Sequence, residues 1–299
     1  MEYQQLGKSS LNISKTGFGC MSLKGEYAEV EKLLTTAYEN GINYFDTADV
    51  YDAGQNEMLV GKVLRPFRKK IILATKGGNE PNPNGSGWKW NASKAYLLKA
   101  CEDSLKRLKT DYIDLYQLHG GTIEDPIDET IEAFETLQQQ GKIRYYGISS
   151  IRPNVIQEYV KRSSLASVMM QYSLLDRRPE ESCLQLLHKN KIGVLARGTI
   201  AGGLLVDKPA KEYLDYTKEE VEQMAATVAK LSDRERSMAQ TAIQFVLQNA
   251  AINSPVVGIR TMAQLWEALN VLKVPMLNSE ELIILKNALP LKVYKDHRE

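Results

Sequence analysis

The stretch KAYLLKACEDSLKRLKTDYIDLYQL, residues 94–118, joins two different patterns of apolar residues. As far as Leu108 the apolar side chains recur every three or four positions, which is the repeat of an amphipathic α-helix. From Tyr112 to Leu118 the apolar and aromatic run is short, as in a buried β-strand. The stretch therefore predicts a helix that leads directly into a strand.

The same alternation continues along the rest of the chain. Further helical patterns cover residues 29–40, 129–139 and 153–161. Eight candidate strands can be placed: TGFG (16–19), INYFD (42–46), IILATK (71–76), YIDLYQL (112–118), YYGIS (145–149), VMMQY (168–172), IGVLA (192–196) and SPVVG (254–258). Repeated strand and helix units predict an α/β fold with a parallel sheet. The 299 residues suit a single-domain (β/α)8 TIM barrel.

Several of these elements have recognisable ends. Ser93 is expected to cap the helix that begins at Lys94, and Pro153 suits the first turn of its helix. Asn40-Gly41 and Gln140-Gly141 have the residue types of helix C-termini. No linker composition divides the chain, so residues 1–299 are expected to form one domain.

Two segments, residues 77–92 and 205–232, are longer than a simple strand and helix unit requires. Long insertions after a barrel strand lie at the catalytic face. The first segment, rich in Gly, Asn and Pro, is therefore expected to form a mobile wall of the substrate site. The second is expected to contain a long polar helix.

Charge and composition narrow the kinds of partner. The formal net charge is +1 with both signs interspersed, which does not favour nucleic acid or an anionic membrane. The Met1 end lacks the pattern of a signal peptide, and no stretch approaches the roughly 18 apolar residues of a membrane span. We expect a cytoplasmic protein with a small-molecule ligand, either a monomer or a weak homo-oligomer.

The cysteines and histidines do not suggest a metal site or a disulfide framework. Cys20, Cys101 and Cys183 are odd in number and far apart in the sequence. The three histidines lack the paired spacing of zinc ligands. Reduced thiols and no bound metal are therefore expected.

Four ionisable residues stand at or just after the ends of predicted strands: Asp46, Tyr51, Lys76 and His119. The carboxyl ends of barrel strands form the catalytic face. Taken singly, each has an ordinary interpretation: an Asp that caps a turn, a Tyr that packs, a Lys in solvent or a core His. Their joint placement favours a catalytic cluster.

At these positions the sequence resembles the aldo-keto reductase family. NYFDTADVYDAGQNEMLVGKVL (43–64) matches the pattern around the family's catalytic Asp and Tyr, ATKGG (74–78) its Lys, and SLKRLKTDYIDLYQLH (104–119) its His. GKIRYYGISS, QYSLLDR and VVGIRTMAQLWEAL follow in the family's order, so the resemblance runs from about Gly19 to Asn270. It implies a (β/α)8 barrel that binds NADPH without a dinucleotide fold. It also implies that Asp46, Tyr51, Lys76 and His119 form the catalytic tetrad.

These residue types suit the reduction of a carbonyl group. Hydride transfer to a carbonyl carbon leaves negative charge on the oxygen, so an acid must supply a proton. Tyr51 is the expected acid, and the ammonium of Lys76, held by Asp46, favours release of the phenol proton. His119 would hydrogen-bond the carbonyl oxygen from a second direction. The predicted function is the NADPH-dependent reduction of aldehydes and ketones to alcohols, with the substrate and the favoured direction left open.

The resemblance also implies cofactor contacts. The implied residues are Gly19, Met21 and Asp46 beside the nicotinamide, Ser149 and Gln171 at its carboxamide, the backbone of Gly203, Leu204 and Leu205 around the pyrophosphate, and Gly258, Arg260, Thr261, Gln264 and Glu267 at the adenosine end. Arg260 would favour NADPH over NADH by pairing with the 2′-phosphate. The ordinary alternatives are a barrel-interior amide for Gln171 and a solvated helix-start residue for Arg260.

Three positions depart from the family's usual pattern. Arg197 stands where relatives commonly have an aromatic residue that stacks on the nicotinamide. Its planar guanidinium could stack there, or it could turn away to bind substrate or a cofactor phosphate. Ala268 replaces an Asn that contacts adenine, and Gly120-Gly121 replace bulkier residues after the catalytic His, which predicts an open substrate pocket.

Two other functions remain to be compared with reduction. One is an NADP(H)-binding regulatory or sensor subunit with slow turnover, because barrels of this family can act as binding partners of other proteins. The other is an aldolase that forms a Schiff base on Lys76. The presence of Asp46, Tyr51 and His119 with that lysine fits hydride transfer better than either.

Overall fold

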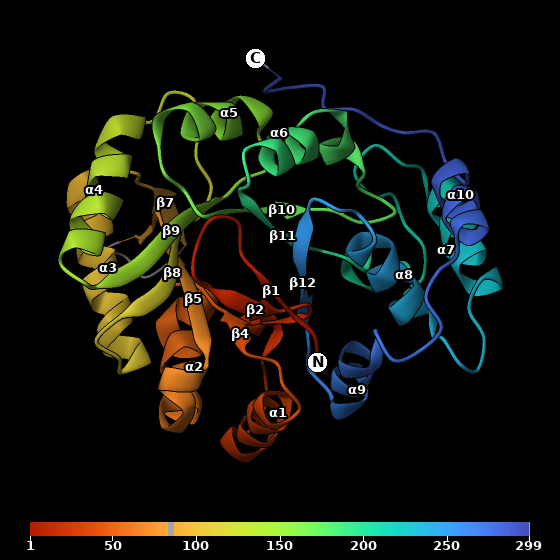
Figure 1. The fold of residues 1–299 in the computed structure, drawn as a ribbon, viewed down its shortest axis with the longest axis horizontal. Coiled ribbons are helices and arrows are strands. Elements are labelled where there is room, and N and C mark those ends of the chain that lie inside the picture. The colour runs from red at the N-terminus through yellow and green to blue at the C-terminus, as the bar shows by residue number, and fades with distance from the viewer. Residues whose placement is uncertain (83–86, 299) are drawn as a thin grey trace.

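The computed structural model describes residues 1–82 and 87–298, and within them eight parallel strands form a closed barrel (Figure 1). Around the barrel the strands follow the order β10-β11-β12-β3-β4-β5-β8-β9. They are β3 (Gly17–Gly19), β4 (Tyr44–Asp46), β5 (Ile72–Gly77), β8 (Ile113–Leu118), β9 (Ile143–Ser149), β10 (Ser167–Gln171), β11 (Gly193–Arg197) and β12 (Ile252–Gly258). Each predicted strand overlaps one of these, so the predicted single-domain (β/α)8 barrel is confirmed.

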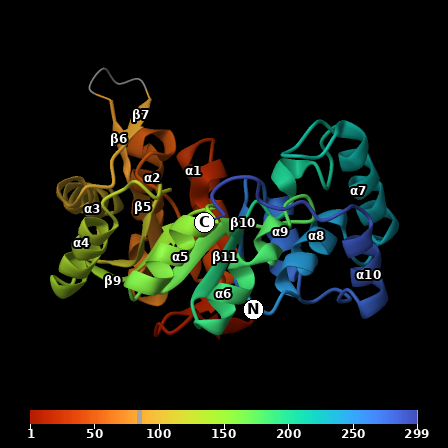
Figure 2. The same cartoon turned by 90° about the horizontal axis from the view of Figure 1, so that it is seen from above.

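Ten α-helices occupy the described ranges. They are α1 (Tyr27–Glu39), α2 (Gln55–Leu64), α3 (Lys94–Leu108), α4 (Ile127–Gln139), α5 (Pro153–Arg162), α6 (Cys183–Lys189), α7 (Lys218–Lys230), α8 (Met238–Leu247), α9 (Met262–Asn270) and α10 (Ser279–Asn287). Helices α1 to α6, α8 and α9 follow the barrel strands in turn. Helices α7 and α10 are additions that pack together at one edge of the molecule (Figure 2).

The predicted helix ends agree closely with the structure. Helix α3 has the predicted bounds, and the Ser93 hydroxyl accepts a hydrogen bond from the backbone N–H of Tyr96. Pro153 is the first residue of α5. Gly41 and Gly141 have positive φ values of 94° and 71°, a backbone conformation that ends a helix and that glycine adopts without strain. Helix α7 is the polar helix expected between residues 205 and 232.

The barrel separates two apolar cores. The larger one lies between the strands and the surrounding helices. The smaller one fills the barrel and consists of Leu6, Leu11, Ile13, Tyr44, Ile72, Ala74, Leu115, Met169, Leu195 and Val256. Its first three members come from a hairpin formed by β1 (Tyr3–Gln5) and β2 (Asn12–Ser14). Gly7 of this hairpin lies against the backbone of Ala166 and Gly193, so the hairpin closes the amino-terminal end of the barrel.

A second hairpin, β6 (Asn79–Pro81) and β7 (Trp88–Trp90), projects beside the other end of the barrel (Figure 2). It belongs to the segment 77–92 predicted as a wall of the substrate site, of which residues 83–86 lie outside the described residues. The Trp90 indole N–H donates a 2.8 Å hydrogen bond to Asp125. A Cβ atom added to Gly120 would lie 3.1 Å from this indole, so Trp90 packs against the turn that follows His119.

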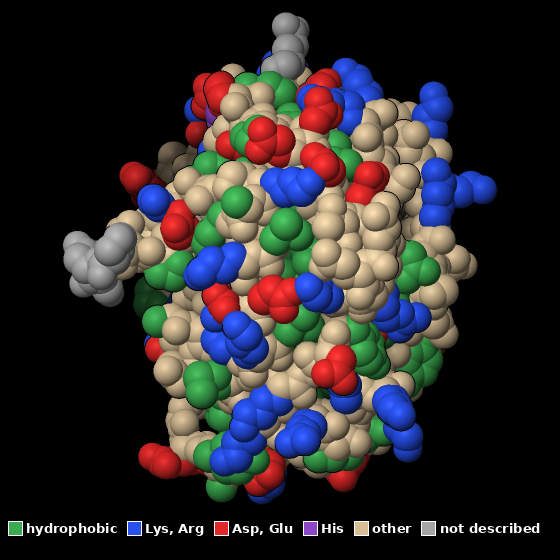
Figure 3. All heavy atoms as spheres, turned by 90° about the vertical axis from the view of Figure 1, so that its left-hand side faces the viewer, with side chains coloured by type: hydrophobic (Ala, Val, Ile, Leu, Met, Phe, Trp, Pro, Cys, Tyr) green, Lys and Arg blue, Asp and Glu red, His purple; other side chains and the backbone are tan. Residues whose placement is uncertain are grey.

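The outer surface carries charges of both signs. Figure 3 shows Lys and Arg side chains interspersed with Asp and Glu on one side of the molecule. The three cysteines are buried and unpaired. No helix within the described ranges combines the length and the apolar character needed to cross a membrane.

Helix α2 packs against the end of α3 at Gly61, where an added Cβ atom would clash with the backbone of Leu108. Gly61→Ala is expected to lower the free energy of unfolding by about 1–3 kcal/mol, because the contact is with backbone that cannot move aside. This cost exceeds the gain of about 1 kcal/mol in helix propensity. Met58→Ala, on the exposed side of α2, is the control and should change stability by less than about 0.5 kcal/mol. Urea unfolding of both variants measures the difference, and parental stability of Gly61→Ala would contradict the prediction.

Candidate active site

A buried ion pair joins the carboxyl ends of β4 and β5. The ammonium of Lys76 contacts Oδ1 of Asp46 and donates a 2.7 Å hydrogen bond to the Thr47 carbonyl. The other oxygen of Asp46 accepts hydrogen bonds from the Tyr44 hydroxyl at 3.2 Å and the Gln117 amide at 3.1 Å. Both charged groups are almost fully buried, and these polar partners offset the cost of removing them from water.

Lys76 keeps its proton in this environment. Burial by itself lowers the pKa of Lys76, but the charges of Asp46 and Tyr51 outweigh burial and raise it above the ordinary value. Its Nζ atom lies 5.2 Å from the centre of the Tyr51 ring. A cation is therefore fixed beside the phenol, as the sequence predicted.

His119 follows β8 and also lies next to Tyr51. The two rings meet edge-on with their centres 5.8 Å apart. Burial, followed by the positive charges of Lys76 and Arg197, lowers the pKa of His119 to about 3. Its Nδ1 atom is buried and has no partner among the described residues. At neutral pH the imidazole is uncharged and has one nitrogen to donate and one to accept a hydrogen bond.

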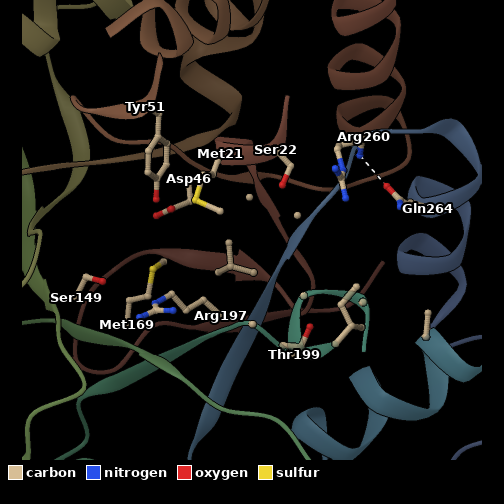
Figure 4. A pocket seen from close by; sticks show the side chains of 18 of the residues that line it. Met21, Ser22, Asp46, Tyr51, Ser149, Met169, Arg197, Thr199, Arg260 and Gln264 are labelled. Atoms are coloured by element: carbon tan, nitrogen blue, oxygen red, sulfur yellow. Dashed lines mark hydrogen bonds between the residues drawn. The ribbon is translucent and has the colours of Figure 1, made fainter. Parts of the chain in front are cut away.

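A cavity of about 980 Å³ opens above these side chains (Figure 4). All four predicted catalytic residues line it. So do the predicted cofactor residues Gly19, Met21, Ser149, Arg197, Gly203, Gly258, Arg260, Thr261, Gln264 and Glu267. The described part of the 77–92 segment contributes no lining residue, so its role as a substrate wall stays a prediction.

Three predicted cofactor residues do not line the cavity. The side chains of Leu204 and Leu205 are buried in the outer core. They follow a tight turn in which Gly202 and Gly203 have φ values of 66° and 101°. The expected contact with the pyrophosphate is through the backbone, so it stays a prediction.

The third residue, Gln171, lies next to the cavity and is engaged at both ends of its amide. Its oxygen accepts a 2.9 Å hydrogen bond from Nη1 of Arg197, and its nitrogen donates a 3.0 Å hydrogen bond to the Tyr213 hydroxyl. Figure 4 shows the Arg197 guanidinium beside Met169 and Ser149. Gln171 therefore holds Arg197 in the cavity.

The sequence did not single out several other lining residues. They are Ser22, Ser150, Ile151, Arg152, Met169, Gly198, Thr199, Ile200, Gly202, Val206, Asp207, Lys208, Ala239, Val256 and Ala263. Most of them follow a barrel strand within a few positions. That position in the sequence is the feature that could have identified them as cavity residues. Ala239 and Ala263 lie in α8 and α9, where the sequence gives no sign of a ligand contact.

The turn that carries Tyr51 has an unusual backbone. Residues 52–54 all have positive φ values, and the two that are not glycine lose roughly 1–2 kcal/mol each in this conformation. Arg107 holds the turn from behind: its Cδ atom would lie 2.9 Å from a Cβ added to Gly54, and its Nε atom lies 2.6 Å from Oε2 of Glu57. Glu57 is fully buried. Tertiary contacts therefore fix the position of Tyr51.

The opposite end of the cavity is formed by the start of α9. The backbone N–H of Arg260 donates a 2.9 Å hydrogen bond to the side-chain oxygen of Gln264, and the guanidinium is exposed. Figure 4 shows these two residues on the far side of the pocket from Tyr51 and Ser149. A Cβ atom added to Gly258 would lie 2.9 Å from the Ser22 hydroxyl, so glycine keeps this wall open.

The cavity has the charges expected of a site for an anionic ligand. Arg197, Lys208 and Arg260 line it, and none forms an ion pair with a carboxylate of the described residues. No group of His, Cys, Asp and Glu within residues 1–82 and 87–298 could hold a metal ion. The cavity therefore joins the cluster of Asp46, Tyr51, Lys76 and His119 to a wall that carries these cations and the carboxylates of Asp207 and Glu267.

Comparison with known proteins agrees with this geometry. The family model described as Aldo/keto reductase family matches residues 15–289. The chain is 49% identical over 307 residues to an uncharacterized oxidoreductase, YqkF, of Bacillus subtilis, with 100% of both chains covered. It is 32% identical over 311 residues to the probable aldo-keto reductase 1 of Glycine max, covering 96% of this chain and 88% of that one.

A solved structure extends the likeness to three dimensions. The holo form of the aldo-keto reductase AKR11C1 from Bacillus halodurans superposes with a TM-score of 0.94 at 46% identity, with both chains fully covered. Its apo form gives a TM-score of 0.85 at 43% identity over the same coverage. The chain therefore belongs to the aldo/keto reductase family and is an oxidoreductase that acts on carbonyl compounds.

Proposed function

We propose that this protein is a cytoplasmic enzyme that reduces aldehydes and ketones to alcohols with NADPH. The observation that carries the proposal is the position of Tyr51, which lies next to both the Lys76 ammonium and the neutral His119 imidazole at the cavity. Hydride reduction of a carbonyl needs a proton donor and a polar group that stabilises the developing oxyanion. This cluster offers both.

The residues of the cavity fit NADPH. The volume of about 980 Å³ accommodates a large ligand together with a substrate. Ser149 would hold the nicotinamide amide, Gly203 and Lys208 the pyrophosphate, and Arg260 the 2′-phosphate. When bound, NADPH supplies the hydride.

Three side chains would share the proton chemistry. The Tyr51 hydroxyl donates its proton to the carbonyl oxygen as negative charge develops there. Lys76, kept charged by Asp46, stabilises the phenolate that remains. Neutral His119 donates a hydrogen bond to the same oxygen and orients the carbonyl.

Arg197 would lie beside the nicotinamide. Its hydrogen bond to Gln171 keeps the guanidinium near Ser149 and Met169, away from Arg260 (Figure 4). This position favours stacking of the planar guanidinium on the ring over binding to the adenosine phosphates.

The alternative of a Schiff-base aldolase fits the lysine poorly. Such a mechanism needs a neutral amine that is free to attack a carbonyl. Lys76 is 1% exposed, and its ammonium is held by Asp46 and the Thr47 carbonyl. A charged amine with these partners is not a nucleophile.

Tyr51→Phe tests the proposed acid. Loss of the hydroxyl should reduce NADPH oxidation with 4-nitrobenzaldehyde by at least about 100-fold, because the proton donor is gone. NADPH affinity, followed by nucleotide fluorescence, should stay within about threefold, since the ring still fills its place. Tyr3→Phe, whose hydroxyl binds the Gly41 carbonyl outside the cavity, is the matched control. If Tyr51→Phe keeps turnover within a few-fold of the parent, Tyr51 is not the acid. If the parent protein itself binds NADPH but does not oxidise it with the aldehyde, a sensor subunit is favoured.

The lowered pKa of His119 predicts that its imidazole stays neutral over the ordinary pH range. Because the pKa is lowered from 6.5 to about 3, its NMR signal should not titrate between pH 8 and pH 5. His119→Gln identifies the signal by its loss. Since the unfolded chain takes up this proton more readily than the folded protein, the residue's contribution to stability is complete above pH 6.5 and is lost as the pH falls towards 3. A signal that moves with a midpoint near pH 6.5 would refute the neutral assignment.

Arg260→Ala tests the reading of the 2′-phosphate. The variant should raise the dissociation constant of NADPH by about tenfold or more and that of NADH by much less, because only NADPH carries the extra phosphate. Titration of nucleotide fluorescence measures both constants. Arg234→Ala, which removes an exposed arginine outside the cavity, serves as the control. Equal losses for the two nucleotides would show that Arg260 does not distinguish them.

A further inference from the structure

Arg152 is a cation of the cavity that the proposed catalysis and cofactor contacts do not use. It follows β9 and precedes α5, and it lines the cavity together with Ile151, Gly120 and Gly121. Its side chain is half-buried, and its Nη1 atom donates a hydrogen bond to the carbonyl of Gly121. That contact fixes the guanidinium beside the turn that follows His119.

The rest of the guanidinium lacks a partner. Among residues 1–82 and 87–298, no carboxylate forms an ion pair with Arg152, and the Gly121 carbonyl is the one acceptor bound by its side chain. The Nε and Nη2 groups therefore remain available on one edge. Two parallel N–H groups on such an edge match the two oxygens of a carboxylate.

The charge balance at this end of the cavity also favours an anion. The carboxylate of Asp46 is paired with Lys76, and His119 is neutral. The unpaired charges left near the catalytic cluster are the guanidinium groups of Arg152 and Arg197. An anionic ligand group would compensate a half-buried guanidinium that is partly removed from water.

The position of Arg152 limits where that anionic group lies on the ligand. The Arg152 guanidinium is held at the carbonyl of Gly121, two residues beyond His119, and Gly120 and Gly121 line the cavity beside it. The proposed carbonyl position lies at Tyr51 and His119 themselves, so the two points are separated by this turn. A ligand that reaches both points has its carbonyl and its anionic group several bonds apart.

We propose that Arg152 selects carbonyl substrates that carry a carboxylate several bonds from the reacting carbonyl, and that it binds this carboxylate through its free Nε and Nη2 edge. The inference rests on the proposed function, because the carbonyl must lie at Tyr51 and His119. It adds a substrate class, oxo acids whose carboxylate is remote from the aldehyde or ketone. Gly120 and Gly121 leave room for the connecting part of the molecule.

Two matched probes test this assignment. 4-Formylbenzoate and its methyl ester present the same aldehyde, and only the first carries a carboxylate. At low ionic strength and pH 7 the parent enzyme should use 4-formylbenzoate with a kcat/KM about tenfold or more above that of the ester, and added salt should reduce this preference. In glyoxylate the carboxylate adjoins the carbonyl. Its kcat/KM should therefore not depend on Arg152.

Arg152→Gln removes the charge and keeps a donor for the Gly121 carbonyl. It should lower kcat/KM for 4-formylbenzoate at least about tenfold more than for the ester, mainly through KM. Lys161→Ala, at the exposed far end of α5, should leave the ratio of the two substrates at its parental value. Calorimetric titration of each protein with the two compounds supplies a second readout that does not depend on turnover.

The outcomes separate the two proposals. If both compounds are reduced without preference, or if Arg152→Gln lowers both equally, the carboxylate assignment is overturned and the proposed reductase function stands. If neither compound is reduced but the calorimetric preference for 4-formylbenzoate disappears in Arg152→Gln, the binding assignment stands and the proposed function is in error. If the parent and Arg152→Gln bind 4-formylbenzoate with equal affinity in calorimetry, the carboxylate assignment is overturned, whether or not the compounds are reduced.

Discussion

The buried ion pair of Lys76 and Asp46 is the interaction on which the catalytic end depends. Removing two such charges from water costs several kcal/mol per ion, so the pair is stable only with its full set of partners. Those partners come from β4, β8 and the residue after β4: the Tyr44 hydroxyl, the Gln117 amide and the Thr47 carbonyl. The parallel register of the barrel brings these groups together. A permanent positive charge then lies beside Tyr51, and the same charge helps to keep His119 neutral.

The cavity above this pair has two cationic regions with different surroundings. One lies at the start of α9 around Arg260, and the other lies near the catalytic cluster around Arg197 and Arg152. Arg197 stands where the resemblance to the family implies an aromatic residue, and its hydrogen bond to Gln171 fixes its orientation. An arginine at that position supplies a flat surface, as an aromatic ring does, and it also adds charge to the end where substrate would bind. In the proposed reductase, cofactor contact and substrate choice would therefore be coupled through one side chain.

Much of this arrangement could be predicted from the sequence, because strands that are buried on both faces leave short apolar runs and the residues after them face one end of the barrel. All eight strands were found in this way, and the four residues predicted to be catalytic lie together at the cavity. Many of the lining residues that were missed lie in turns whose course depends on distant contacts, such as Arg152, which is held by the Gly121 carbonyl. The sequence also did not indicate that the side chains of Leu204 and Leu205, whose backbone is expected at the pyrophosphate, would be buried in the outer core after the turn at Gly202 and Gly203.

The closure of the barrel has a consequence for how the chain is made. Strand β12 pairs with β3, and Ser254 donates a hydrogen bond to Ser14, which is 240 positions earlier in the chain. At roughly 5–20 residues per second, a ribosome needs on the order of tens of seconds to synthesise the intervening segment. During that time Leu6, Leu11 and Ile13 have no completed barrel to enter, because Val256 belongs to the same inner core. The inner core can therefore form only near the end of translation, and the nascent chain must stay soluble with its first hairpin undocked.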